Sequence, residues 1–208
     1  MSRRLRDPRT LVASYPLNNH AQDISGHGLH GIWTGTEAYA AFLKNSRQAG
    51  DFAGANDYIT LPFAAASHMN GQTAWSVALW FLADALQGTL FSFEDGLNDG
   101  VYIDHLDGVE VRVNTVASIS ASVKVGTWTH VVAVKEAAGL QSLYINGDLA
   151  DTDDSSAETV AVTGDPLLGV HEDLSGDLNG READVRLYSC ALTNDEILKL
   201  FHAPVPTY

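Results

Sequence analysis

The segment GREADVRLYSCALTNDEI, residues 180–197, joins a strand pattern to a helix start and carries the clearest signal for the fold. Apolar and polar residues alternate through its first half, so we expect a strand with one apolar and one polar face. Ala183, Val185 and Leu187 are predicted on the apolar face. Asp184 is therefore predicted to point away from the core.

The second half of this segment predicts one short helix within LTNDEILKLFHA, residues 192–203. Thr193 is a suitable N-cap, and Glu196 three residues later completes a capping box. Ile197 and Leu200 share one face of this helix. We therefore expect it to pack on an edge of the surrounding strands.

Outward from this segment, the chain reads as about twelve short strands of period two, broken by Gly, Asn and Asp turns. They are LVASY, DYITL, AWSVALWF, GTLFSF, GVYID, GVEVRVN, ASISASV, WTHVVAV, LQSLYI, GDLAD, PLLGV and EADVRLY. Asn146-Gly147, between two of these runs, suits a two-residue type I′ hairpin. The pattern predicts a two-sheet antiparallel sandwich.

The length of 208 residues, 45% of them apolar, suits one globular core and is short for two. We divide the chain into a basic N-terminal arm (1–10), a sandwich (11–203) and a tail (204–208). Cys190 is the only cysteine, which excludes an internal disulfide and favours a packed thiol.

The formal charge of −14 is unevenly distributed. The arm holds four arginines against the single acid Asp7; they are Arg3, Arg4, Arg6 and Arg9. The acidic remainder repels phosphate, so we do not expect nucleic acid as the main partner. The arm is predicted to be either a disordered terminus or a latch that binds an acidic neighbour.

The start, MSRRLRDPRTLVASYPL, contains no apolar run of the length that a secretory signal requires. We therefore expect no signal peptide and synthesis in the cytoplasm. The longest apolar stretch, AWSVALWFLA, is about half of what a bilayer needs. Membrane insertion is not expected.

Seven motifs in order resemble the laminin-G-like domains of the concanavalin A-like jelly-roll superfamily, which are also close to pentraxins. They are YPLNNHAQDISGHGLHG, DFAGANDYITLP, WSVALWF, WTHVVAV, LYINGDLA, LLGV and GREADVRLYSCALTNDEI. The resemblance covers nearly the whole chain, from about Leu11 to Leu200. It implies an all-β, two-sheet antiparallel jelly-roll sandwich with one short C-terminal helix, used more often for binding sugars or proteins than for catalysis.

The resemblance also implies a structural calcium ion between an early D-x-S-G turn and a late D-V-R-x-Y strand. The matching positions are Asp23 and Asp184. The turn at Gly26 exposes backbone carbonyl oxygens, which can coordinate calcium alongside carboxylates. Gly26 is therefore included among the predicted ligands. The family often has two acids before V-R, whereas this chain has Ala183 first. The alternative is an Asx turn and an Asp–Arg pair without metal.

The stretch NNHAQDISGHGLHGIW, residues 18–33, also contains three histidines. Its glycines disfavour a helix that would align His27 with His30, and zinc needs further ligands. We expect these histidines to border a turn whose glycines have positive φ. Trp33 is the tryptophan predicted to bind a ligand, because it lies in a Gly-rich loop.

The sequence predicts binding and not catalysis. It lacks the alternating carboxylates of sandwich glucanases, a G-x-S-x-G elbow, an HExxH helix and a phosphate loop. The favoured role is a calcium-stabilised structural or decorating component of a larger assembly, such as the capsid or tail of a phage virion, attached through the arm arginines. The alternative is a free, calcium-dependent glycan-binding adhesion module.

Overall fold

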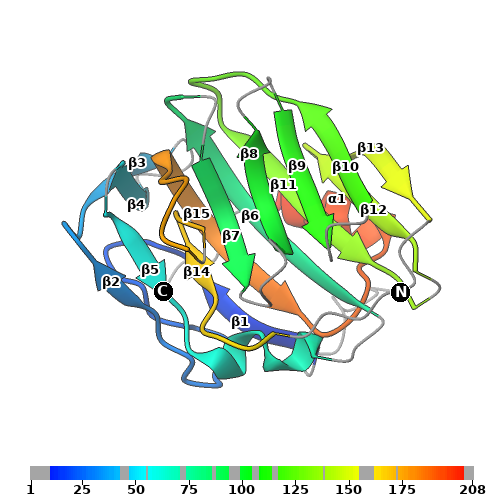
Figure 1. The fold of residues 1–208 in the computed structure, drawn as a ribbon, viewed down its shortest axis with the longest axis horizontal. Coiled ribbons are helices and arrows are strands. Elements are labelled where there is room, and N and C mark those ends of the chain that lie inside the picture. The colour runs from blue at the N-terminus through cyan, green and yellow to red at the C-terminus, as the bar shows by residue number, and fades with distance from the viewer. Residues whose placement is uncertain are drawn as a thin grey trace.

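The protein was analysed as a computed structural model. It describes residues 10–42, 47–54, 56–70, 74–85, 88–93, 99–104, 108–113, 117–137, 139–154, 162–171 and 173–203. Two antiparallel sheets stack face to face, as Figure 1 shows, with β7 to β10 in front and β6 and β15 behind. The predicted two-sheet jelly-roll sandwich is confirmed.

Sheet A has the order β13-β12-β11-β6-β15-β4-β3, and β1 pairs with β15 beside β4. Its central strands β6 and β11 are buried along nearly their whole length, as expected for apolar runs covered on both faces. The strands are β1 (Leu11–Tyr15), β3 (Tyr39–Phe42), β4 (Arg47–Ala53), β6 (Trp75–Ala83), β11 (Thr129–Lys135), β12 (Gln141–Ile145), β13 (Asp148–Asp153) and β15 (Asn179–Tyr188).

Sheet B has the order β10-β9-β8-β7-β14-β5-β2. Its strands are β2 (Ile32–Thr34), β5 (Tyr58–Thr60), β7 (Gly88–Phe93), β8 (Asp99–Asp104), β9 (Gly108–Val113), β10 (Ala117–Ser122) and β14 (Leu167–Leu168). Two 3-10 turns, η2 (Phe63–Ala65) and η3 (Ser67–Met69), follow β5. Strands β2, β3 and β4 were not predicted.

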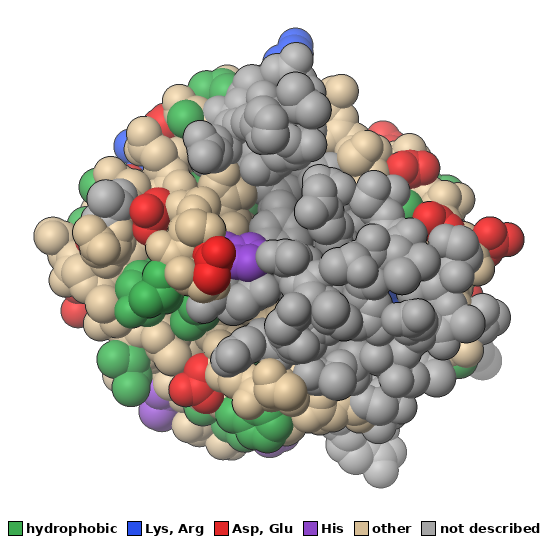
Figure 2. All heavy atoms as spheres, viewed as in Figure 1, with side chains coloured by type: hydrophobic (Ala, Val, Ile, Leu, Met, Phe, Trp, Pro, Cys, Tyr) green, Lys and Arg blue, Asp and Glu red, His purple; other side chains and the backbone are tan. Residues whose placement is uncertain are grey.

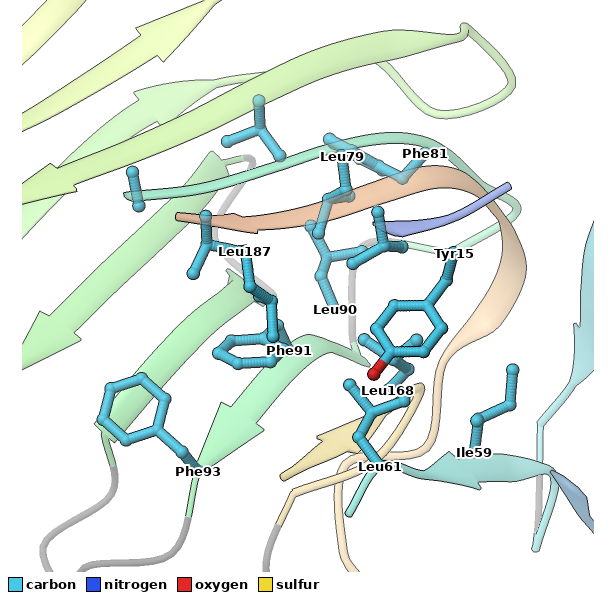
Figure 3. Packing of buried hydrophobic residues seen from close by; sticks show 14 of the residues in the cluster. Tyr15, Ile59, Leu61, Leu79, Phe81, Leu90, Phe91, Phe93, Leu168 and Leu187 are labelled. Carbon is cyan, nitrogen blue, oxygen red and sulfur yellow. The ribbon is translucent and has the colours of Figure 1, made fainter. Parts of the chain in front are cut away.

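The main core fills the space between the two sheets. Figure 3 shows Leu79, Phe81 and Leu187 from sheet A packed in one cluster with Phe91 and Leu168 from sheet B. All five are fully buried. Because each such side chain contributes about 1.5–3 kcal/mol on burial, this cluster is the main source of stability.

The outer face of sheet A carries a second apolar layer beneath α1 (Asn194–His202). Ile197 and Leu200 of the helix pack on Val132 and Val134 of β11. The predicted capping box is confirmed, and the backbone N–H of Thr193 donates to Glu196 Oε2 at 2.8 Å. The helix covers the sheet face, whereas the sequence predicted an edge. No helix in the described ranges is long and apolar enough to cross a membrane.

A β-bulge in β15 changes the predicted alternation. Asp184 has φ +52°, and the pairing with β6 shifts register between Ala183 and Arg186. Ala183 consequently packs in the outer cluster with Trp80 and Trp128, while Val185 and Leu187 enter the main core. The prediction that these three share one face is therefore wrong, because the extra residue of a bulge rotates the strand.

The bulge also places Glu182 on the core side. Glu182 lies opposite Phe81 of β6 and Gly50 of β4, and Phe81 belongs to the main core. Asp184 points away from that core, as predicted, because it pairs with Arg186, which lies opposite the outward-facing Ala78. Two acids two positions apart therefore occupy opposite sides of sheet A.

Candidate ligand-binding site

Asp23, the first predicted metal ligand, is buried and organises the turn after β1. Its Oδ1 accepts hydrogen bonds from the N–H groups of Ser14 at 2.9 Å and Ser25 at 2.8 Å. Its Oδ2 accepts from Ser25 Oγ at 2.8 Å and from the N–H of Leu29 at 3.0 Å. Burial disfavours the charge, but these bonds lower the pKa of the carboxyl group. The carboxylate forms an Asx turn with Ser25.

Three histidines surround this turn, and each forms a hydrogen bond with a backbone group close to it. Each uses Nδ1 in a hydrogen bond: His20 with Gln22 N–H at 3.2 Å, His27 with Val12 O at 2.8 Å, and His30 with Asp23 N–H at 3.1 Å. Within the described ranges, no three His, Cys, Asp or Glu residues are grouped to hold a metal ion. The histidines border the turn, as predicted, and shape its backbone.

The glycines of this turn serve two purposes. Gly26 and Gly28 have φ of +96° and +72°, which confirms the predicted positive φ. Gly31 differs, because a Cβ there would lie 2.7 Å from Ile59 Cγ2. Gly31 is therefore required for close packing of the loop against β5.

Asp184, the second predicted metal ligand, forms a bidentate ion pair. Its Oδ1 accepts from Arg186 Nε and its Oδ2 from Arg186 Nη2, both at 2.8 Å. The two side chains are 7% and 13% exposed. Arg186 therefore occupies both oxygens of this carboxylate.

In this arrangement the predicted calcium ligands do not fit a calcium ion, which takes six to eight oxygens. N–H and O–H donors already use the oxygens of Asp23, and a cation would have to displace Arg186 from Asp184. Gly26, the third predicted ligand, is exposed. The structure contains the Asx turn and the Asp–Arg pair that were the alternative. The calcium site stays a prediction.

Trp33, the predicted ligand-binding aromatic, is half-buried and packs against the main core. Its ring stacks on Phe52 at 5.0 Å between centroids and contacts Tyr39 edge-on at 5.5 Å. Phe52 therefore covers one ring face, which leaves less surface for a ligand. Its binding role stays a prediction. The arm arginines lie outside the described residues; they are Arg3, Arg4, Arg6 and Arg9.

A pocket of about 390 Å³ lies on the outer face of sheet A. Four separate segments form it: β3, the end of β6, the loop before β11, and β15. The lining residues are Ala41, Phe42, Leu82, Gly126, Thr127, Trp128 and Arg181. We refer to this feature as the sheet A pocket.

Local backbone contacts position the pocket walls. Arg181 lies directly opposite Leu82 of β6. Gly180 before it is required, because a Cβ there would lie 2.3 Å from Leu82 O. The N–H of Gly126 donates to Ala83 O at 2.8 Å, which holds the loop at the end of β6.

The chemistry of the pocket combines an apolar wall with two polar groups. Phe42 and Trp128 pack edge-to-face at 4.5 Å between centroids, and both are buried. The polar groups are the exposed Thr127 and the guanidinium of Arg181. An apolar surface with few polar groups is typical of small-ligand sites. None of the lining residues is an acid.

Sequence reasoning missed this pocket because its parts are distant in the chain. Trp128 is buried, but its cluster lies on the outer face of sheet A and not between the two sheets. Phe42 belongs to a strand that was not predicted. The one available signal was Arg181 at the start of the READVRLY strand.

The family model Laminin_G_3, described as concanavalin A-like lectin/glucanases superfamily, matches residues 53–198. Comparison with curated proteins gives no match. The structure is similar to domain 4 of AbnA, an extracellular arabinanase from Geobacillus stearothermophilus, in complex with arabinotriose. That comparison has a TM-score of 0.73 at 21% identity and covers 93% of this chain and 98% of the other.

The structure is also similar to two toxin binding domains. For Paraclostridial Mosquitocidal Protein 1 the TM-score is 0.76 at 14% identity, covering 94% of this chain and 52% of the other. For the binding domain of Botulinum Neurotoxin DC in complex with SialylT the TM-score is 0.68 at 15% identity, and the comparison covers 94% of this chain and 52% of the other. The chain thus spans about half the length of these domains. At such identities the likeness shows the fold alone.

Proposed function

We propose that this chain, which belongs to the concanavalin A-like lectin/glucanases superfamily, is a non-catalytic module that binds glycans. The observation that carries the proposal is the sheet A pocket, in which an aromatic wall lies beside a guanidinium and a hydroxyl group. Sugars present both apolar C–H faces and polar groups, so this lining suits them. The complexes of the arabinanase domain with arabinotriose and of the toxin domain with SialylT support the ligand class.

The absence of acids from the pocket lining supports binding without hydrolysis. Glycoside hydrolysis generally requires two carboxyl groups about 5–10 Å apart on either side of the scissile bond. The carboxylate of Asp51 lies near the pocket, and its Oδ1 accepts from Arg181 Nε at 3.1 Å. A single carboxylate held in this way does not supply the required pair.

A role in a virion or another large assembly stays a prediction, because its argument rests on the arm arginines, which lie outside the described residues. Acidic side chains are scattered over the described part of the face seen in Figure 2. Such a surface disfavours nucleic acid as a partner.

The test is to fill the sheet A pocket without disturbing the core. Thr127→Trp places a large ring at an exposed lining position, whereas Thr152→Trp makes the same change at an exposed position on β13. Binding would be measured on a glycan array and by calorimetry. We expect Thr127→Trp to weaken glycan binding by more than about tenfold, or 1.4 kcal/mol, with Thr152→Trp unchanged. Equal binding by both variants, or no binding by the wild type, would reject the proposal.

A further inference from the structure

Arg181 is the charged group of the sheet A pocket and retains free hydrogen-bonding capacity. Its Nε donates to Asp51 Oδ1 at 3.1 Å, and the side chain is 32% exposed. Its two Nη groups make no hydrogen bond with any part of the chain that the structure describes. The guanidinium therefore has one fixed edge and one edge that is available.

The contact with Asp51 orients this available edge. Asp51 lies directly opposite Arg181 on the neighbouring strand β4. A guanidinium is planar, so a bond at Nε restricts the plane in which the Nη groups donate. Arg181 is thus oriented before a ligand binds, because the pairing of β15 with β4 places Asp51 beside it.

The polar lining is rich in donors and poor in acceptors. A guanidinium donates five N–H groups and accepts none, and the hydroxyl group of Thr127 both donates and accepts. Because no lining residue is Asp or Glu, the hydroxyl groups of a neutral sugar find few acceptors. The complementary ligand group is an acceptor, and a planar carboxylate matches the guanidinium with two parallel hydrogen bonds.

We propose that the sheet A pocket selects acidic glycans, with the carboxylate of a uronic or sialic acid residue bound by the Nη groups of Arg181. The sugar ring then lies against the apolar wall of Phe42, Leu82 and Trp128, and Thr127 bonds one of its hydroxyl groups. The inference rests on the proposed glycan-binding function and specifies in addition that the bound glycan carries a negative charge. Asp51 acts as a positioning residue that also competes with the ligand for Arg181.

The test compares ligands that differ in charge and little in shape. The pairs are trigalacturonic acid with its methyl ester, and sialyllactose with lactose; a sulfated galactan oligosaccharide is a further probe. Calorimetry at low and physiological salt would measure the affinities. We expect at least one acid to bind more than about tenfold tighter than its neutral partner, as charge-assisted hydrogen bonds predict, with the difference smaller at higher salt.

Variants then assign the effect to Arg181. Arg181→Gln is expected to weaken acid binding by more than about tenfold, and Arg181→Lys to an intermediate extent because it keeps the charge without the fork. Asp51→Asn is expected to strengthen acid binding, because it removes a competing carboxylate. Lys124→Gln removes one positive charge from an exposed site outside the lining and is the matched control. Thermal unfolding would show that each variant is folded.

The possible failures are distinct. Neutral sugars that bind as well as acids, with sensitivity to Thr127→Trp, would overturn the acidic-glycan inference and leave the proposed function standing. Acid binding that Arg181→Gln does not change, or that Lys124→Gln weakens equally, would also overturn it. Binding of only the sulfated probe would reject the carboxylate. No binding to any sugar would reject the inference and the proposed function together.

Discussion

The turn at Asp23 and the core side of β15 at Glu182 each bury an acid, with opposite consequences. Asp23 accepts four hydrogen bonds, three of them from backbone N–H groups. Glu182 is fully buried, and neither of its carboxyl oxygens has a hydrogen-bond partner. The pKa of Asp23 is lowered despite its burial, whereas burial raises the pKa of Glu182 well above its usual value. Donors, more than depth, therefore decide whether a buried acid stabilises the fold.

Asp184 on the other side of the same strand is also satisfied in hydrogen bonding, because Arg186 donates to both of its oxygens. Burial nevertheless raises the pKa of its carboxyl group, against the opposing effect of the Arg186 charge. The bulge separates it from Glu182 by turning the two acids to opposite sides. Glu182 faces Gly50, which has no side chain with which to bond it. The contrast between satisfied and unsatisfied acids can therefore be tested one residue at a time.

The largest effect is expected from Asp184→Ala, which removes the carboxylate that pairs with the buried guanidinium of Arg186. Removing one member of a buried pair costs about 3–5 kcal/mol in the free energy of unfolding. Urea unfolding at pH 7 would measure it. Asp154→Ala, at an exposed position, is the control and should change the free energy by less than about 0.5 kcal/mol. A similarly small change for Asp184→Ala would show that the pair contributes little.

Asp23→Ala is expected to lower the free energy of unfolding by about 2–4 kcal/mol, because three backbone N–H groups lose their acceptor. Asp23→Asn retains one acceptor oxygen and should fall between Asp23→Ala and the wild type. The lowered pKa means that this contribution is present at neutral pH and is lost as pH falls below the usual carboxyl range. Equal stability of Asp23→Ala and wild type in urea would contradict the organising role of Asp23 in the turn.

Glu182→Gln is expected to change the pH dependence of stability. Because the pKa of Glu182 is raised in the fold, the folded protein holds a proton that the unfolded chain releases above the usual glutamate pKa of 4.5. Wild-type stability should therefore fall by up to about 1.4 kcal/mol per pH unit above that value, until the folded-state group ionises, and Glu182→Gln should lack this decline. Unfolding free energies at pH 4.5 to 8 would show it.

His68 has the opposite dependence, because burial lowers its pKa to about 4. Its neutral form is favoured in the fold, so it adds a gain in stability as pH rises from about 4 to its usual pKa near 6.5. The wild type and the Glu182→Gln variant both contain His68. Its contribution therefore cancels when the unfolding free energy of the variant is subtracted from that of the wild type at each pH. If this difference in unfolding free energy does not change with pH, the pKa of Glu182 is not raised in the fold.

The smallest effect is expected from calcium. Because hydrogen bonds and Arg186 already use the oxygens of Asp23 and Asp184, millimolar calcium or a chelator should shift the melting temperature by less than about 1 °C. Differential scanning calorimetry would measure the shift. A rise of several degrees that both Asp23→Ala and Asp184→Ala abolish would support the calcium site that the family resemblance implies.

Features that depend on neighbouring residues could be predicted from the amino-acid sequence without the structure. The capping box joins Thr193 to Glu196, and the hairpin turn needs positive φ at Asn146 and Gly147, which have +53° and +89°. Strand periodicity similarly identified twelve strands. These signals are local because a cap, a tight turn and a pleat each involve residues only a few positions apart.

The position of the bulge and the composition of the pocket became visible only in the folded chain. An alternating apolar–polar pattern does not reveal where a bulge inserts an extra residue. The alternation across Asp184 therefore predicted the wrong face for Ala183 and Glu182. Strand β2 has three residues, too few for a periodic signal. Arg181 meets Asp51 across 130 positions of sequence, and four segments converge on the pocket. Such contacts follow from strand order, which the pattern within each strand does not specify.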